Sequence, residues 1–197
     1  MGGGDDVLNS AKLKNGDSVD MGAGDDTVSI MVSGGSDGTP TIANLNLAKL
    51  DGGAGNDTLK FEESGSNTTE LTLTTGGATN FENISGSGGS ETIKGDANAN
   101  ILTGAGGSDI LYGYAGDDIL AGGKRGTITL SQIANWDDDT HSWNNADNTG
   151  NNTLYGGAGN DNLYGGYYAD TIDGCTGTET LFGGNGNDNF INREGDA

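Results

Sequence analysis

The sequence predicts an all-β fold: a parallel β-roll, or right-handed β-solenoid, interrupted by three insertions. A nine-residue repeat keeps its phase without a break through residues 77–121 and again through 147–191. Glycine accounts for 39 of the 197 residues, and only 31% of the chain is hydrophobic. Such a composition leaves too few apolar side chains for a conventional core. Most of those present recur at one position of the repeat, which predicts a core one residue wide.

The clearest copy of the repeat is residues 52–60, which read GGAGNDTLK. Glycine occupies positions 1, 2 and 4, an acidic residue position 6, and a large apolar residue position 8. Positions 7–9 predict a very short strand whose middle side chain points inward. Positions 1–6 predict a turn in which the glycines at positions 2 and 4 adopt left-handed backbone angles. Each nonapeptide is therefore expected to form one turn and one strand.

One domain is expected over residues 1–197, with repeats at 1–29, 43–60, 77–121 and 147–191. Insertions are expected at 30–42, 61–76 and 122–146. Residues 43–51 are a degenerate copy in which only the apolar Leu50 is retained. The predicted core consists of the position-8 residues: Leu8, Val19, Val28, Leu50, Leu59, Ile84, Ile93, Leu102, Leu111, Leu120, Leu154, Leu163, Ile172, Leu181 and Phe190.

The pattern Gly-Gly-x-Gly-x-Asp-x-U-x, where U is a large apolar residue, resembles the calcium-binding repeat of the RTX family of bacterial proteins. The resemblance covers most of the chain. It implies a roll that binds several Ca²⁺ ions, export by type I secretion, and folding outside the cell. The expected location is therefore extracellular or on the bacterial cell surface.

The chemistry of calcium explains the spacing. Calcium takes six to eight oxygen ligands, both carbonyls and carboxylates. One turn supplies too few, but two turns stacked on the same side of the roll, two nonapeptides apart, could share an ion. The predicted metal ligands are Asp6, Asp17, Asp26, Asp57, Glu91, Asp109, Asp118, Asp161, Asp170 and Asp188. The expected neighbours are Glu91 with Asp109, Glu82 and Asn100 with Asp118, Asn152 with Asp170 and Asp188, and Asp161 with Glu179.

The charge of the chain gives calcium a second role. The formal net charge is −21, so the calcium-free chain repels itself. Bound cations would offset much of this charge. We therefore expect a largely unfolded chain without calcium and an all-β chain with it. Turns with Asn or Glu at position 6 are expected to bind calcium more weakly.

Other functions lack sequence signals. There is no His-Glu-x-x-His, no Gly-x-Ser-x-Gly and no Cys/His pair, so no enzymatic activity is expected. The acidic balance argues against nucleic acid, and no apolar stretch is long enough for membrane insertion. The single cysteine, Cys175, occupies a position normally held by glycine and is interpreted as an evolutionary replacement of that glycine. A monomeric module is expected.

The third insertion carries the candidate ligand-binding residues. It contains both tryptophans of the chain, and loops on rigid scaffolds are where binding residues concentrate. Tryptophan offers a large contact area, and aspartate can hold a further calcium ion. The predicted ligand-binding residues are Trp136, Asp137, Asp138, Asp139 and Trp143. An equally weighted alternative is that the insertion only covers the roll, because Ile101, Ile110 and Ile119 occupy the outward-facing position 7.

The leading functional hypothesis is a calcium-dependent ligand-binding module of a large RTX adhesin that binds a peptide or a carbohydrate on a cell surface. The alternative is a purely structural, calcium-triggered folding and secretion module of an RTX toxin, hydrolase or surface-layer protein. Exposed aromatic side chains are expected at position 9, where Tyr112, Tyr155 and Tyr164 lie. Tyr168 replaces a position-4 glycine, which is expected to weaken one calcium turn.

Overall fold

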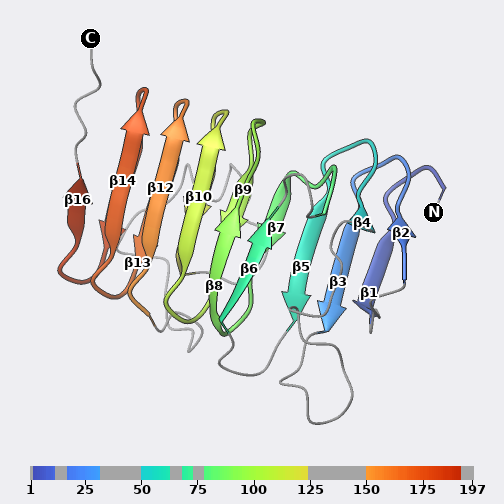
Figure 1. Cartoon of the computed structure of the whole chain (residues 1–197), viewed down its shortest axis with the longest axis horizontal. Coiled ribbons are helices and arrows are strands. Elements are labelled where there is room, and N and C mark those ends of the chain that lie inside the picture. Colours follow the sequence, from blue (N-terminus) through green and yellow to red (C-terminus); the bar gives the residue numbers. More distant parts are fainter. Residues whose placement is uncertain are drawn as a thin grey trace.

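The chain folds into a parallel β-roll in which every described nonapeptide contributes one strand (Figure 1). The computed structural model describes residues 2–11, 17–31, 50–62, 68–72, 78–123 and 150–191. Over these residues the strands lie side by side along the long axis, with β1 towards one end and β16 at the other (Figure 1). The described part of the chain contains no helix long and apolar enough to cross a membrane.

Two parallel sheets make up most of the roll, and a two-stranded sheet adds to them. The larger sheet has eight strands in the order β1 (Val7–Ala11), β3 (Thr27–Met31), β5 (Thr58–Glu62), β7 (Asn83–Ser85), β9 (Ile101–Thr103), β11 (Ile119–Ala121), β13 (Asn162–Gly166) and β15 (Thr180–Gly184). The smaller has six strands in the order β16 (Asn189–Ile191), β14 (Thr171–Thr176), β12 (Thr153–Ala158), β10 (Ile110–Ala115), β8 (Ser90–Lys94) and β6 (Thr68–Thr72). The two-stranded sheet pairs β2 (Val19–Asp20) with β4 (Leu50–Asp51).

The register of the sheets follows from the period of the repeat. The chain crosses from one sheet to the other with each nonapeptide, so neighbouring strands within a sheet are two nonapeptides apart. Leu120 pairs with Leu102 on one side and with Leu163 on the other. In the smaller sheet, Leu111 pairs with Ile93 and Leu154 in the same way. Position 8 therefore stacks on position 8 throughout, which confirms the predicted β-roll.

The core is built on the column of position-8 side chains between the sheets, and towards the N-terminal end it also contains Met21, Ile30, Phe61, Ala78 and Phe81. The position-8 side chains in the middle of the roll are fully buried, as predicted: Ile93, Leu102, Leu111, Leu120, Leu154, Leu163 and Ile172 are each 0% exposed. At the C-terminal end of the smaller sheet, Phe190 is 50% exposed. With so narrow an apolar layer, hydrophobic burial alone gives limited stability.

The turns use left-handed backbone angles at positions 2 and 4 of the repeat. In the clearest copy, Gly53 has a φ of 105° and Gly55 a φ of 152°. Three residues with side chains take the same conformation at position 2: Ala105 (79°), Tyr114 (80°) and Cys175 (68°). Cys175 thus adopts the backbone of the glycine it replaces. Side chains at such angles cost on the order of 1–3 kcal/mol each.

Part of the segment predicted as the second insertion belongs to the sheets. β5 continues through Phe61 to Glu62, and Thr68–Thr72 form β6, which pairs in parallel with β8. Leu71 lies opposite Ile93, in phase with the position-8 column. The stretch from Leu71 reads as strand-like in sequence, but the repeat register did not place it in a sheet because that register relied on turn glycines and an acidic residue. Threonine and leucine are sufficient to continue a ladder.

The outer faces of the two sheets differ, which the repeat register did not predict. Tyr164 was expected to be exposed, but it is 7% exposed and lies 6.4 Å from Phe182 between ring centroids. Together with Ala121 and Ile101 these rings form a second, smaller hydrophobic cluster on the eight-stranded sheet. Of the position-7 isoleucines, Ile119 is buried and Ile110 is 36% exposed. One repeat position can therefore be buried on one sheet and open on the other.

Leu111→Ala should lower the free energy of unfolding of the calcium-loaded protein by about 2–5 kcal/mol, because it leaves a cavity in a layer one residue wide. Phe190→Ala is the matched control, since Phe190 holds the same repeat position but is half exposed, and it should cost much less. Urea unfolding of both variants in calcium measures the difference. Equal losses would contradict a core formed by the central position-8 residues.

Candidate metal centre

The position-6 side chains form two rows, one for each series of turns. The long row precedes the strands of the eight-stranded sheet: Asp6, Asp26, Asp57, Glu82, Asn100, Asp118, Asp161 and Glu179. The short row precedes the strands of the six-stranded sheet: Glu91, Asp109, Asn152, Asp170 and Asp188. Within each row, neighbours come from turns stacked on one another, as the two-nonapeptide spacing requires.

One oxygen of each central carboxylate links two coils. In the short row, Asp109 Oδ1 accepts the backbone N–H of Glu91 at 2.8 Å. In the long row, Asp118 Oδ1 accepts the N–H of Asn100 at 2.8 Å. The N–H of Asp118 in turn donates to Asp161 Oδ1 at 2.8 Å. Such bonds run without a break along the short row from Glu91 to Asp188. In the long row they link Asp6 to Glu82 and Asn100 to Asp161, whereas Asn100 Oδ1 accepts the N–H of Asp96 in its own turn.

The second oxygen of these carboxylates has no partner in the protein. Among the described position-6 aspartates, the Oδ2 atoms that are buried without a hydrogen bond belong to Asp26, Asp57, Asp109, Asp118, Asp161 and Asp170. A buried, unsatisfied carboxylate oxygen is costly, and nearly all such atoms in native proteins are paired. A repeated set of them on one repeat position indicates a ligand that recurs with the repeat.

The glycines at position 1 leave room for that ligand. The point where a Cβ atom on Gly165 would lie is 2.5 Å from Asp170 Oδ2 and 2.6 Å from the carbonyl oxygen of Gly183, one coil further on. The corresponding point on Gly156 is 2.5 Å from Asp161 Oδ2 and 2.8 Å from the Gly174 carbonyl oxygen. Oxygens of calcium sites lie at about 2.3–2.6 Å from the ion. A small cation fits this space, and any side chain at position 1 would fill it.

Backbone carbonyls must supply much of the coordination. Among the described residues, no three acidic, histidine or cysteine side chains converge on a common point. One carboxylate oxygen from a turn, with carbonyls from that turn and the next, is the donor set that the geometry provides. Hard oxygen donors of this kind suit calcium.

The rows also perturb the acidity of their members. Burial is the largest cause and raises the pKa of Asp118 to about 7 and that of Asp170 to about 6. The neighbouring carboxylates Asp161 and Asp188 add to the respective increases, while backbone hydrogen bonds oppose them. Burial likewise raises the pKa of Asp57, Asp109 and Asp161. Anions held this close are unfavourable at neutral pH unless cations accompany them.

In one turn of the short row, Asn152 takes the place of the acidic residue at position 6. Its Oδ1 accepts the N–H of Asp109 at 2.9 Å, as an aspartate would. Its Nδ2 then occupies the place of the second carboxylate oxygen and donates to the Gly165 carbonyl at 3.3 Å. The amide thus satisfies a carbonyl that would otherwise face an ion. Weaker calcium binding at this turn remains a prediction, and the amide hydrogen bond to the Gly165 carbonyl gives it a physical reason.

The remaining predicted ligands lie towards the ends of the rows. Asp6 is half-buried, and its N–H donates to Asp26 Oδ1 at 2.7 Å. Asp188 is half-buried and accepts the N–H of Asp170 at 2.9 Å. Asp17 is exposed and lies just before β2, which pairs with β4 rather than with a strand of either large sheet.

Two acidic residues in the long row were absent from the predicted ligand set. Glu82 Oε2 accepts the N–H of Asp57 at 2.7 Å, and Glu179 Oε1 is buried without a hydrogen bond. Their position-6 register was the signal that could have identified them. The predicted ligand-binding residues Trp136, Asp137, Asp138, Asp139 and Trp143 lie outside the described residues.

Asp118→Asn should raise the calcium concentration at the midpoint of folding by roughly tenfold, because it removes one ligand charge while keeping the Oδ1 hydrogen bond. Asp117→Asn is the matched control, since Asp117 is the exposed neighbour whose Oδ1 accepts the N–H of Asn160. Circular dichroism during calcium titration gives both midpoints. The same shift in both variants would argue against a specific role for position 6.

Without calcium, acidification should favour folding. The pKa of these carboxyl groups is raised in the fold and close to 3.9 in the unfolded chain, so the folded state binds more protons between these values. Their contribution to stability is therefore present at about pH 4 and lost as the pH rises towards 7. In chelator, circular dichroism should show β structure near pH 4.5 that is absent at pH 8. Calcium should restore it at pH 8, and identical spectra in chelator and calcium at that pH would contradict this account.

Comparison with known proteins agrees with this geometry. The family model of the RTX calcium-binding nonapeptide repeat (four copies) matches residues 49–60, 85–124, 146–166 and 155–190. These ranges contain the central members of both rows. No curated protein matched the chain. The all-β roll, its register and the family match together show that the chain belongs to the RTX family of calcium-binding nonapeptide-repeat proteins.

Proposed function

We propose that this chain is a calcium-dependent ligand-binding module of an RTX adhesin, acting outside the cell or on the bacterial surface. In this proposal calcium builds the scaffold, and residues outside the regular roll bind a peptide or a carbohydrate of another cell. The module is non-catalytic and monomeric, and it neither binds nucleic acid nor inserts into a membrane.

The continuity of the roll across the third insertion is the observation that carries the proposal. The N–H of Asp118 reaches Asp161 Oδ1 at 2.8 Å although 43 residues separate them in sequence. The N–H of Asp109 reaches Asn152 Oδ1 in the same way. β10 pairs with β12 and β11 with β13 in unbroken register. The strands that precede and follow residues 124–149 therefore pair directly with one another, and insertions into a continuous scaffold are where binding residues concentrate.

The composition of that insertion suits recognition. Trp136 and Trp143 provide apolar contact area with a polar indole N–H. The three aspartates between them, Asp137, Asp138 and Asp139, provide oxygen ligands for a further calcium ion. A peptide C-terminal carboxylate or the vicinal hydroxyls of a sugar could complete the coordination of such an ion.

A second candidate function is favoured by the two rows themselves. Their unpaired carboxylate oxygens tie folding to calcium whether or not a ligand binds. A calcium-triggered folding and secretion module of a toxin, hydrolase or surface-layer protein would need nothing more. In that case the insertions serve as covers for the roll.

Replacing Trp136 and Trp143 together by alanine should abolish ligand binding while the calcium-induced β structure remains. Binding is measured on a peptide and glycan array in millimolar calcium, with a chelator control. Tyr168→Ala is the matched control, because Tyr168 is an aromatic residue of the roll that is 47% exposed. Unaltered binding by the double variant would refute the assignment, and an array without any hit would favour the folding module.

A further inference from the structure

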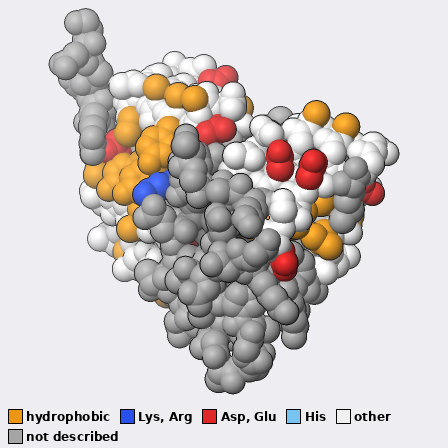
Figure 2. Space-filling model, turned by 45° about the vertical axis from the view of Figure 1, so that its right-hand side comes forward, with side chains coloured by type: hydrophobic (Ala, Val, Ile, Leu, Met, Phe, Trp, Pro, Cys, Tyr) orange, Lys and Arg blue, Asp and Glu red, His pale blue; other side chains and the backbone are white. Residues whose placement is uncertain are grey.

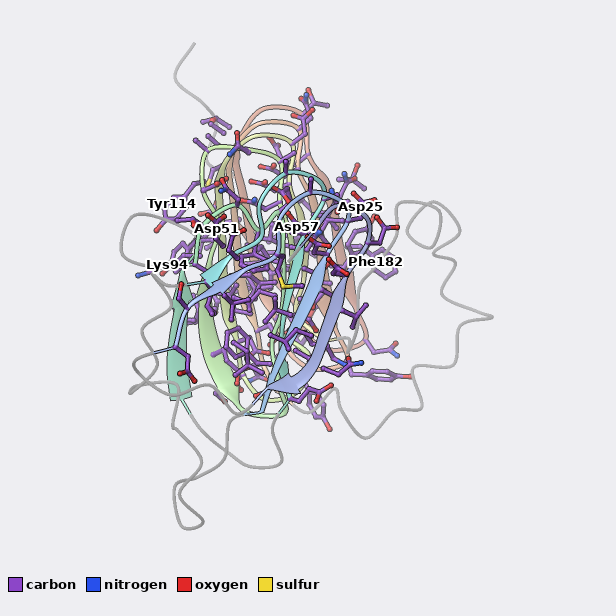
Figure 3. The ribbon with its side chains drawn as sticks, turned by 90° about the vertical axis from the view of Figure 1, so that its right-hand side faces the viewer. Asp25, Asp51, Asp57, Lys94, Tyr114 and Phe182 are labelled. Carbon is purple, nitrogen blue, oxygen red and sulfur yellow. The ribbon has the colours of Figure 1, made fainter. Side chains whose placement is uncertain are left out.

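Three tyrosines form an ordered array on the outer face of the six-stranded sheet. The Tyr112 and Tyr155 rings are stacked with centroids 5.0 Å apart and an angle of 8° between their planes. The Tyr114 ring is stacked with that of Tyr112, at 6.0 Å and 16°. Hydrophobic side chains gather on one flank of the roll beside a basic group (Figure 2). Tyr114 and Lys94 point away from the roll on the side opposite Phe182 (Figure 3).

The register of β10 and β12 defines four neighbouring side-chain positions, two on each strand. Tyr112 pairs with Tyr155, and two residues further along, Tyr114 pairs with Gly157. Three of the four places therefore hold a phenol ring, and the fourth holds a glycine. Gly157 in turn pairs with Cys175 of β14, so the gap lies between the side chains of two strands that flank β12.

The fourth place lies in an open, shallow pocket. Its volume is about 410 Å³, and it is lined by Tyr112, Tyr114, Tyr155, Gly156, Gly157 and Cys175. Its volume lies within the range of small-molecule sites. A side chain at Gly157 is not tolerated, because φ is +114° and a Cβ atom would collide with the backbone of Tyr114. Neighbouring strands are about 4.8 Å apart, and β12 lies between β10 and β14. The space above Gly157, between the side chains of Tyr114 and Cys175, therefore has the thickness of one ring.

The walls of this pocket are strained. Tyr114 and Cys175 both occupy position 2, where the repeat has glycine, and both take left-handed backbone angles. Tyr114 is nevertheless 46% exposed, so its side chain gains little from burial. Strained residues with side chains cluster at functional sites. Two such strained residues on either side of the gap above Gly157 indicate a site for a ligand.

We propose that this pocket, the tyrosine slot, binds a pyranose ring of a neutral glycan. A pyranose has an apolar face that can stack on the Tyr114 ring and a rim of hydroxyl groups. The phenol hydroxyls can both donate and accept hydrogen bonds, so they complement that rim. Lys94 pairs with Tyr112 in the register of the sheet and places a hydrogen-bond donor at one side of the array.

Charge and polarity select this ligand over others. With a net charge of −21, the chain disfavours anionic glycans. An aromatic side chain of a peptide could also stack in the slot, but it has no hydroxyl rim to match the polar groups around the array. The tyrosine slot is lined by residues of the roll, so this proposal does not depend on the function proposed for the tryptophan-containing insertion.

The test uses the calcium-loaded chain with cellobiose, lactose and maltose as probes and N-acetyltyrosinamide as the aromatic probe. Saturation-transfer NMR detects contact, and calorimetry measures affinity. Tyr114→Gly restores the glycine of the repeat, so the roll stays folded, and sugar affinity should fall about tenfold or more with loss of the stacking face. Ala105→Gly is the matched control, since it relieves the same strain at position 2 away from the slot, and it should leave affinity unchanged.

Two further variants separate the alternatives. Tyr155→Phe removes only a hydroxyl group and should weaken sugar binding without affecting the aromatic probe. The Trp136 and Trp143 double variant should retain disaccharide binding, which distinguishes this site from that of the proposed function. No binding of any disaccharide, equal affinities for Tyr114→Gly and Ala105→Gly, or tighter binding of N-acetyltyrosinamide than of the sugars would overturn the proposal. Loss of disaccharide binding in the tryptophan variant would overturn it as well.

Discussion

The fold depends on buried carboxylates that the protein only half satisfies. One oxygen of Asp118 or Asp170 caps the backbone of the preceding coil, and the other faces a glycine-lined space with no protein donor. A row of such anions repels itself, and burial intensifies the effect. From β8 onwards the apolar layer between the sheets is one side chain wide, and it cannot offset much of this cost. Cations between the coils are what make the stacked arrangement favourable, so the shape of the molecule is linked to its ionic surroundings.

The repeat predicts the parts of the fold that depend on one position at a time. Position 8 is buried because each coil places it between the sheets, and left-handed φ values appear at Gly53 and Gly55 because the turn requires them. What could not be predicted depends on neighbours outside the nonapeptide. β6 belongs to the six-stranded sheet although its segment lacks the turn residues of the repeat. Tyr164 is buried, whereas Tyr112, at the same repeat position on the other sheet, is only half-buried.

The candidate metal site likewise has features that the repeat predicts and features that depend on neighbouring coils. Position 6 identifies the carboxylates, and the spacing gives their order in each row. The role of Asn152 was not visible in sequence, because it depends on where the amide nitrogen lies relative to the Gly165 carbonyl of the next coil. Likewise, the tyrosine slot arises from the alignment of Tyr114, Gly157 and Cys175 on three adjacent strands that are far apart along the chain. Periodicity predicts each strand, whereas the surface that several strands create together requires the register.

The arrangement of the strands has a mechanical consequence. β1 and β16 lie towards opposite ends of the roll, and each coil bonds only to the coils beside it (Figure 1). A pulling force applied at the two ends therefore acts on the coils in series and peels them from an end rather than shearing a whole sheet. Each coil that detaches separates the oxygens of one shared cation site, so resistance to tension rises with the surrounding calcium concentration. At Asn152 the amide hydrogen bond to the Gly165 carbonyl adds a contact between coils that does not depend on calcium.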